Sequence, residues 1–126
     1  MKPELDKAGY PLEWPMLVGS DFCREELYDG TSKYCLEGHL SLVFDGGGDT
    51  YTGNSDPSPR RKMLKLLGLA TKQLGARIVG PYLSDVNDCE RNSLRLLSRI
   101  WNLAGAMKGY VVDNPETKTL KKMTAK

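Results

Sequence analysis

The sequence has no long apolar run, and no stretch approaches the roughly 20 residues that a membrane-spanning helix requires. It also lacks the apolar stretch of a secretory signal, because residues 1–6 are acidic and proline-bearing. The three cysteines are widely spaced and odd in number, which does not indicate a disulfide framework. We therefore expect a cytoplasmic chain with reduced thiols and no membrane contact.

Signatures of catalysis and of ligand binding are equally scarce. His39 is the single histidine, and no Cys-x-x-Cys pair of the kind that structural zinc sites usually contain is present. The glycine run 46–48 lacks the lysine of a phosphate-binding loop and the spaced oxygen ligands of a calcium loop, so it predicts a connector. We expect no catalytic residue, no metal and no cofactor. The scarcity of these motifs favours a protein that is not an enzyme.

One pair of residues keeps an enzyme open as an alternative. Cys35 and His39 stand four residues apart, so on a helix their side chains share one face. A thiolate beside an imidazole can act as nucleophile and base, whereas the structural alternative is a buried cysteine next to a surface histidine. Cys23 and Cys89 would complete a formal zinc set with these two, and the spacing does not decide whether the four converge.

Charge is unevenly divided along the chain. The net charge is +2, but residues 1–57 carry 4 Lys or Arg against 11 Asp or Glu, whereas residues 58–126 carry 14 against 5. The sign changes in the loop 45–59, which is rich in Gly, Pro and small polar residues. Because 126 residues suit one core rather than two, we expect one domain whose halves pack together or face different partners.

A first helix is predicted at the start of the basic half. Ser58 suits the N-cap position and Pro59 the first helical position. Apolar residues then recur at helical spacing from Met63 to Leu74, and Gly75 favours termination of the helix.

A second helix is predicted with the same regularity. Asn92 or Ser93 caps it, and a broad apolar face runs from Leu96 to Met107 before Gly109 ends it. Between the two helices, Asn87-Asp88 is interpreted as a turn in which both side chains accept hydrogen bonds from nearby backbone N–H groups. The predicted core consists of Leu36, Leu40, Val43, Leu64, Leu67, Leu74, Leu97, Ile100, Trp101 and Ala104.

The acidic half is harder to interpret. In residues 33–44, Leu36, Leu40 and Phe44 fit both the alternation of a strand and the stripe of a helix, so the pattern leaves both open. The Asp-Gly pair at 29–30 predicts a turn that joins two short extended pieces. Three prolines in the first 20 residues leave room for a short helix at most.

These features predict a mainly α fold, a small helical domain with a short β-hairpin or an extended N-terminal segment. An α+β fold with a small antiparallel sheet is the alternative. We expect a single globular domain over residues 1–112, with a short strand at 110–112. A polar, Lys-rich C-terminal tail is expected over residues 113–126.

Two short motifs carry a resemblance to a known family. Tyr34-Cys35-Leu36-Glu37-Gly38-His39-Leu40 follows the Asp-Gly turn, and Val86-Asn87-Asp88 comes shortly before the cap of the last helix. Together they resemble a family of small uncharacterised proteins from phages, actinobacteria and other mobile elements, over residues 20–106. The resemblance implies that residues 34–44 form a helix, and Phe22 stands where the family usually has tryptophan. The family has no established activity, so the resemblance implies no catalytic residue.

The basic residues supply the candidate binding surface. Three of them open the helix after Pro59, where cations oppose the helix dipole at about 0.3–1 kcal/mol each. Either the acidic half, with Asp45, Asp49 and Asp56 nearby, or an external polyanion should compensate them. The candidates for binding a nucleic acid or an anionic partner are Arg60, Arg61, Lys62, Lys65, Lys72, Arg91, Arg95 and Arg99.

Three functional hypotheses follow. The leading one is a non-enzymatic accessory protein of a mobile element, such as a phage or an integron cassette, that acts by binding another macromolecule; its partner is an unknown protein or a second copy in a homodimer. The second is a nucleic-acid-binding protein that uses the Arg/Lys helix stripes and loses affinity as salt rises. The third is the small Cys/His-dependent enzyme. The sequence does not identify the partner, the activity or the oligomeric state.

Overall fold

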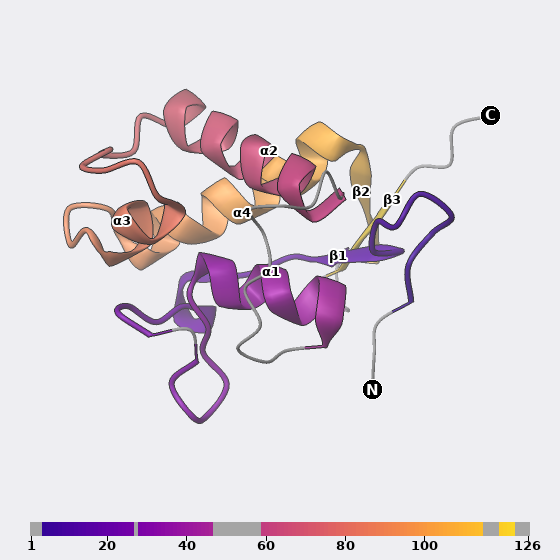
Figure 1. Cartoon of the computed structure of the whole chain (residues 1–126), viewed down its shortest axis with the longest axis horizontal. Coiled ribbons are helices and arrows are strands. Elements are labelled where there is room, and N and C mark those ends of the chain that lie inside the picture. The colour runs from indigo at the N-terminus through magenta and orange to yellow at the C-terminus, as the bar shows by residue number, and fades with distance from the viewer. Residues whose placement is uncertain (1–3, 27, 47–58, 115–118, 123–126) are drawn as a thin grey trace.

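The computed structural model describes residues 4–26, 28–46, 59–114 and 119–122. The elements in these residues follow in the order β1 (Glu13–Pro15), the 3-10 helix η1 (Gly19–Asp21), α1 (Leu36–Asp45), α2 (Pro59–Gln73), α3 (Leu83–Asp88), α4 (Leu94–Lys108), β2 (Tyr110–Asn114) and β3 (Thr119–Lys122). Figure 1 shows α4 returning beneath α2 toward the strands, with α1 on the other side of the core. The small domain is mainly helical, as the sequence predicts.

The helices begin and end where capping residues dictate. Ser93 accepts a hydrogen bond from the Leu96 N–H at 3.0 Å, and Gly109 ends α4 with a φ of 110°. Residues 36–45 are helical because Cys35 caps them, with its Sγ accepting from the Gly38 N–H at 3.3 Å. This settles the ambiguity of residues 33–44. Ser58, the predicted cap of α2, lies outside the described residues.

The three strands form one small antiparallel sheet in the order β1-β3-β2. Leu120 of β3 lies between Trp14 of β1 and Val112 of β2, so the last strand in sequence is the central one. The sheet therefore reaches past the domain boundary that the sequence predicts at residue 112. The predicted turn at 29–30 is present, with an antiparallel bridge between Tyr28 and Tyr34 at its base.

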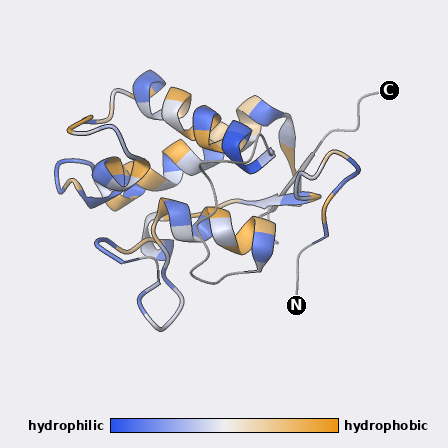
Figure 2. Cartoon of the chain, in the orientation of Figure 1, coloured by the Kyte–Doolittle hydropathy of each residue, from blue (hydrophilic) through white to orange (hydrophobic). Residues whose placement is uncertain are grey.

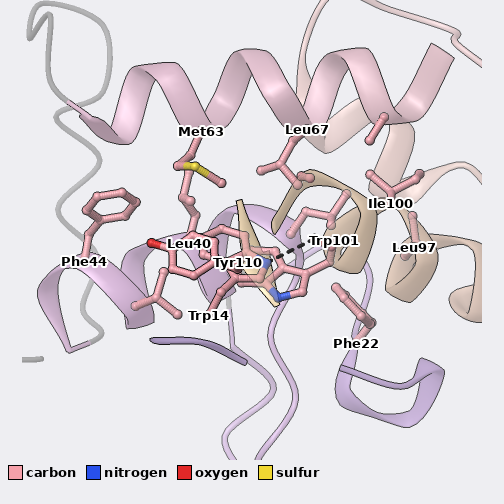
Figure 3. Packing of buried hydrophobic residues seen from close by; sticks show 14 of the residues in the cluster. Trp14, Phe22, Leu40, Phe44, Met63, Leu67, Leu97, Ile100, Trp101 and Tyr110 are labelled. Carbon is pink, nitrogen blue, oxygen red and sulfur yellow. Dashed lines mark hydrogen bonds between the residues drawn. The ribbon is translucent and has the colours of Figure 1, made fainter. Parts of the chain in front are cut away.

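Two stacked indoles lie at the centre of the molecule. The Trp14 and Trp101 ring centroids are 4.1 Å apart and nearly parallel (Figure 3). Trp14 Nε1 donates to the Trp101 carbonyl at 3.1 Å, and Trp101 Nε1 donates to the Pro15 carbonyl at 2.8 Å. One step further along, Asn102 exchanges two hydrogen bonds with the backbone of Leu17. The extended N-terminal segment is thereby held along α4.

The core is larger than the sequence indicates. Eight of the ten predicted core residues are buried, while Leu64 and Leu74 are half-buried against them. Hydrophobic and hydrophilic residues alternate along the helices, as expected for helices with one face on the core (Figure 2). The buried hydrophobic residues that the prediction omits are Tyr10, Trp14, Phe22, Cys35, Phe44, Met63, Ala70, Val86 and Tyr110.

Replacement of Gly105 by alanine should destabilise the fold. A Cβ at this buried position of α4 would collide with the indole ring of Trp14, which the stack on Trp101 holds in place. We expect the free energy of unfolding in urea to fall by about 1–3 kcal/mol. Gly68→Ala in α2 is the matched control, because its Cβ would meet no atom within 4 Å, and it should gain about 0.5–1 kcal/mol. Equal stability of Gly105→Ala and the native chain would contradict the close packing.

Candidate functional site

The Cys35 side chain caps helix α1. Its Sγ accepts the Gly38 N–H as the cap of α1, and the side chain is buried. Burial raises the pKa of the Cys35 thiol above its ordinary value, although hydrogen bonds from the Gly38 and Glu37 backbone lower it in part. The thiol is therefore mainly protonated at neutral pH, the opposite of an activated nucleophile.

His39 also serves the fold. The ring is buried, and Nε2 lies 2.7 Å from the Asp21 carbonyl oxygen, so Nε2 carries the proton that makes this hydrogen bond. Phe22, Tyr34 and Trp101 surround the ring. Burial lowers the pKa of the imidazole, which keeps it neutral. The sequence interpretation of His39 as a surface residue is wrong, because α1 turns this face toward the core.

The cysteines and the histidine do not assemble into a metal site. Within the part of the chain that the structure describes, no group of three or more His, Cys, Asp or Glu side chains could hold a metal ion. Cys23 hydrogen bonds to the carbonyls of Glu26 and Lys33, and all three thiols are unpaired. Burial, followed by nearby negative groups, raises the pKa of Cys23 to about 11.

Arg60 differs from the other seven candidate binding residues. Its side chain is buried, Nη1 donates to Asp45 at 2.6 Å, and Nη2 donates to the Ser41 hydroxyl at 2.5 Å. Arg60, a predicted binding residue in the first turn after Pro59, is thus buried rather than open to an external partner, because Asp45 and Ser41 of α1 bind its guanidinium. Asp45 therefore compensates the positive charge of Arg60 at the start of α2, as predicted for the acidic half. Asp49 and Asp56 lie outside the described residues.

The seven other basic candidates are exposed, and the described residues contain no ion pair to any of them. They lie on two helices and the loop before α4. The exposed candidates are Arg61, Lys62, Lys65 and Lys72 on α2, Arg91 in the loop, and Arg95 and Arg99 on α4.

The sequence does not indicate the hydrogen-bond network around α3. Arg24 donates to the carbonyls of Asn87 and Cys89, which lack helical partners at the end of α3, and to the carbonyl of Asn92 in the loop before α4, at 2.6–2.8 Å. Asn87 accepts from the Leu36 N–H and donates to the Cys23 carbonyl. Asn87 and Asp88 serve the fold, but the prediction that they form a turn with nearby backbone partners is wrong, because they end helix α3 and their backbone partners are distant in sequence.

An apolar groove lies between α2, the connector 76–82 and α3. Its volume is about 450 Å³, within the usual range of ligand and peptide pockets. Leu64, Leu83 and Val86 form part of its wall. Ile78 and Tyr82 line it from the connector while 50% and 68% exposed, so the groove has an exposed apolar rim.

Specific contacts fix the wall of this groove. The Asn92 side chain exchanges hydrogen bonds with the Arg77 backbone at 2.7 and 2.9 Å. Asp85 accepts from the Tyr82 N–H at 3.0 Å, and a Cβ on Gly80 would run into the Asp85 carboxylate. The connector has no regular secondary structure, yet these contacts define its course. The groove is therefore formed before any partner binds.

Glu37 joins the groove to a second hollow. It lines both, and the second hollow, of about 220 Å³, adds the carboxylates of Glu25, Glu26 and Asp88. Burial raises the pKa of Glu37, and the charge of Arg60 offsets this only in part. No hydrogen bond to its carboxylate is found among the described residues. A half-buried carboxylate without a donor is a feature typical of binding sites.

Comparisons with known proteins provide no parallel for this arrangement. No family model, no curated protein and no solved structure matches the chain. The resemblance carried by the two short motifs stays a prediction. In the residues that the structure describes, no helix has the length and apolar character needed to cross a bilayer.

The thiols should react slowly in the folded protein. Burial raises the pKa of both Cys23 and Cys35. We therefore expect iodoacetamide at pH 7.5 to alkylate each of these thiols more slowly than it alkylates free glutathione, by about tenfold for Cys23. Mass spectrometry of the digested protein would assign the rates, and unfolding in urea should restore normal reactivity. Alkylation of Cys35 faster than glutathione would revive the Cys/His enzyme.

Arg60 and Arg61 should differ sharply despite their adjacent positions. Arg60→Gln removes charged hydrogen bonds to Asp45 and Ser41, so the free energy of unfolding should fall by about 1–3 kcal/mol. Arg61→Gln changes an exposed side chain and should stay within about 0.5 kcal/mol of the native chain. Urea denaturation monitored by tryptophan fluorescence measures both, and equal effects would argue against a structural role for Arg60.

Proposed function

We propose that this chain is a non-enzymatic accessory protein that acts by binding another protein, and that the binding site is the groove between α2, the connector 76–82 and α3. The observation that carries the proposal is the exposure of Ile78 and Tyr82 at the mouth of a preformed apolar groove. Large apolar side chains that rim a groove gain free energy when a partner covers them. The mobile-element setting of this proposal rests on the resemblance in sequence alone.

The state of Cys35 and His39 also favours binding over catalysis. Each makes hydrogen bonds that serve the fold, and burial moves each pKa away from the value that a nucleophile and a base need. A Cys/His enzyme would have to disrupt the N-cap of α1 to release its thiol.

Nucleic-acid binding is the second candidate function. The observation that favours it is the exposure of seven basic side chains on α2, α4 and the loop before α4. Backbone phosphates would be their natural partners, and such binding requires no groove. The two candidates share Lys72, which lines the groove, and otherwise use different residues of the same chain.

One set of variants separates the two candidates. Peptides selected from a random library on the full chain should lose about tenfold in affinity for an Ile78→Thr, Tyr82→Ser variant, because two apolar contacts disappear. Val112→Thr, also at an exposed apolar residue but on β2, should bind as the native chain does. Fluorescence anisotropy with labelled peptides, duplex DNA and single-stranded RNA is the measurement.

The outcomes are distinct. Selection of no peptide, or equal loss in the Val112→Thr control, would contradict the groove. Salt-sensitive binding of DNA or RNA that survives the groove variant but falls in Arg91→Gln, Arg95→Gln, Arg99→Gln would establish the second candidate instead.

A further inference from the structure

The charges around the groove narrow the chemistry of its partner, an inference that rests on the function proposed above. Glu37, from the first turn of α1, lines the apolar groove. Lys72, from α2, also lines it, and its side chain is exposed. The two charges are therefore unequal in their surroundings: water already solvates Lys72, whereas Glu37 is half-buried and has no hydrogen-bond donor among the described residues.

The second hollow extends the negative charge. Its lining consists of Glu25, Glu26, Cys35, Glu37, Ser84 and Asp88, without a basic side chain. Asp88 accepts from the Glu25 N–H and from Asn87 Nδ2, so it is held in place. Arg24 adjoins these residues in sequence, but its guanidinium donates to three backbone carbonyls around α3. An apolar groove thus leads, across Glu37, into an acidic hollow.

A partner that covers the groove must also compensate the desolvation of the Glu37 carboxylate. Covering a half-buried carboxylate removes its remaining water, which is unfavourable unless a donor replaces that water. Arg60 is close enough to act on Glu37, but its Nη1 and Nη2 bind Asp45 and Ser41, and its buried Nε makes no hydrogen bond to Glu37 or to any other described residue. An acidic group of the partner would add repulsion from the hollow, and a neutral group would leave Glu37 with only the partial compensation that Arg60 provides. A cationic side chain supplies both the hydrogen-bond donor and the counter-charge that Glu37 requires.

We propose that the groove binds a peptide segment of another protein that places apolar side chains against Leu64, Leu83 and Val86 and a Lys or Arg side chain on Glu37. The apolar contacts supply most of the affinity, and the pairing with Glu37 supplies selectivity for a basic residue beside the apolar ones. The carboxylates of the second hollow attract the same cation from further away.

The charge of selected peptides tests this proposal. A random peptide library would be selected in parallel on the full native chain, on Glu37→Gln and on Lys72→Gln. Peptides from the native chain should be enriched in Lys and Arg beside apolar residues, severalfold over the library. The enrichment should vanish with Glu37→Gln and persist with Lys72→Gln, the matched control that removes the opposite charge from the same groove.

A double-mutant cycle then measures the contact itself. For one selected peptide, replacing its basic residue by glutamine should weaken binding to the native chain about tenfold and leave binding to Glu37→Gln nearly unchanged. Circular dichroism and urea denaturation confirm that Glu37→Gln folds.

The results distinguish the proposal from the function on which it rests. Selected peptides that need Ile78 and Tyr82 but show no basic enrichment, or an enrichment that Glu37→Gln retains, would overturn the cationic partner and leave the groove as a binding site. Selection of no peptide that depends on Ile78 and Tyr82 would overturn both.

Discussion

The stack of Trp14 on Trp101 is the contact on which the rest of this structure depends. It joins residues 87 apart in sequence, and both rings are fully buried. A buried indole needs an acceptor for its N–H, and here each N–H finds a backbone carbonyl on the opposite segment. The segment around β1 has little reason of its own to be ordered, yet these bonds fix it along α4. The stack holds β1 in place, and β1 pairs with the central strand β3. The Trp14 ring also lies so close to α4 that position 105 must be glycine.

The two oppositely charged halves share one apolar core, and charged side chains join them at only a few points among the described residues. Arg60 of the basic half reaches Asp45 and Ser41 of α1, and Arg24 of the acidic half reaches the carbonyls around α3. In both cases a guanidinium meets oxygen atoms that a helix end or a neighbouring helix supplies, so charge serves local geometry. The uneven net charge along the chain therefore does not predict which residues of the two halves contact each other, because most of the charged side chains remain in water.

The sequence pattern predicts α2 and α4 well, leaves α1 open between helix and strand, and does not predict α3, for physical reasons. Periodicity, caps and terminal glycines depend on local interactions, so α2 and α4 follow from them closely. Trp14 and Phe22 were missed because an extended, proline-bearing segment has no periodic pattern to mark its buried side. Asn87 and Asn92 look like local turn and cap residues, but their partners lie up to 64 residues away. Arg60 is indistinguishable from Arg61 until α1 is in place beside it. The groove follows from the course of the connector, which depends on these distant bonds.

Glu37 shows how a local rule and the whole structure can disagree. A carboxylate in the first turn of a helix is favoured by the helix dipole, so the residue looks stabilising in sequence. The structure half-buries it without a donor, and burial outweighs the nearby charge of Arg60 in raising its pKa. A group whose pKa is raised on folding supplies most stability while protonated and loses it as pH rises through the folded pKa, so at neutral pH the ionised Glu37 opposes folding. Asp45, by contrast, accepts a hydrogen bond from Arg60 Nη1 at 2.6 Å. Of the two carboxylates that α1 presents near Arg60, one stabilises the fold, and the other lies at the junction of two hollows, where a cation from a partner would relieve its burial.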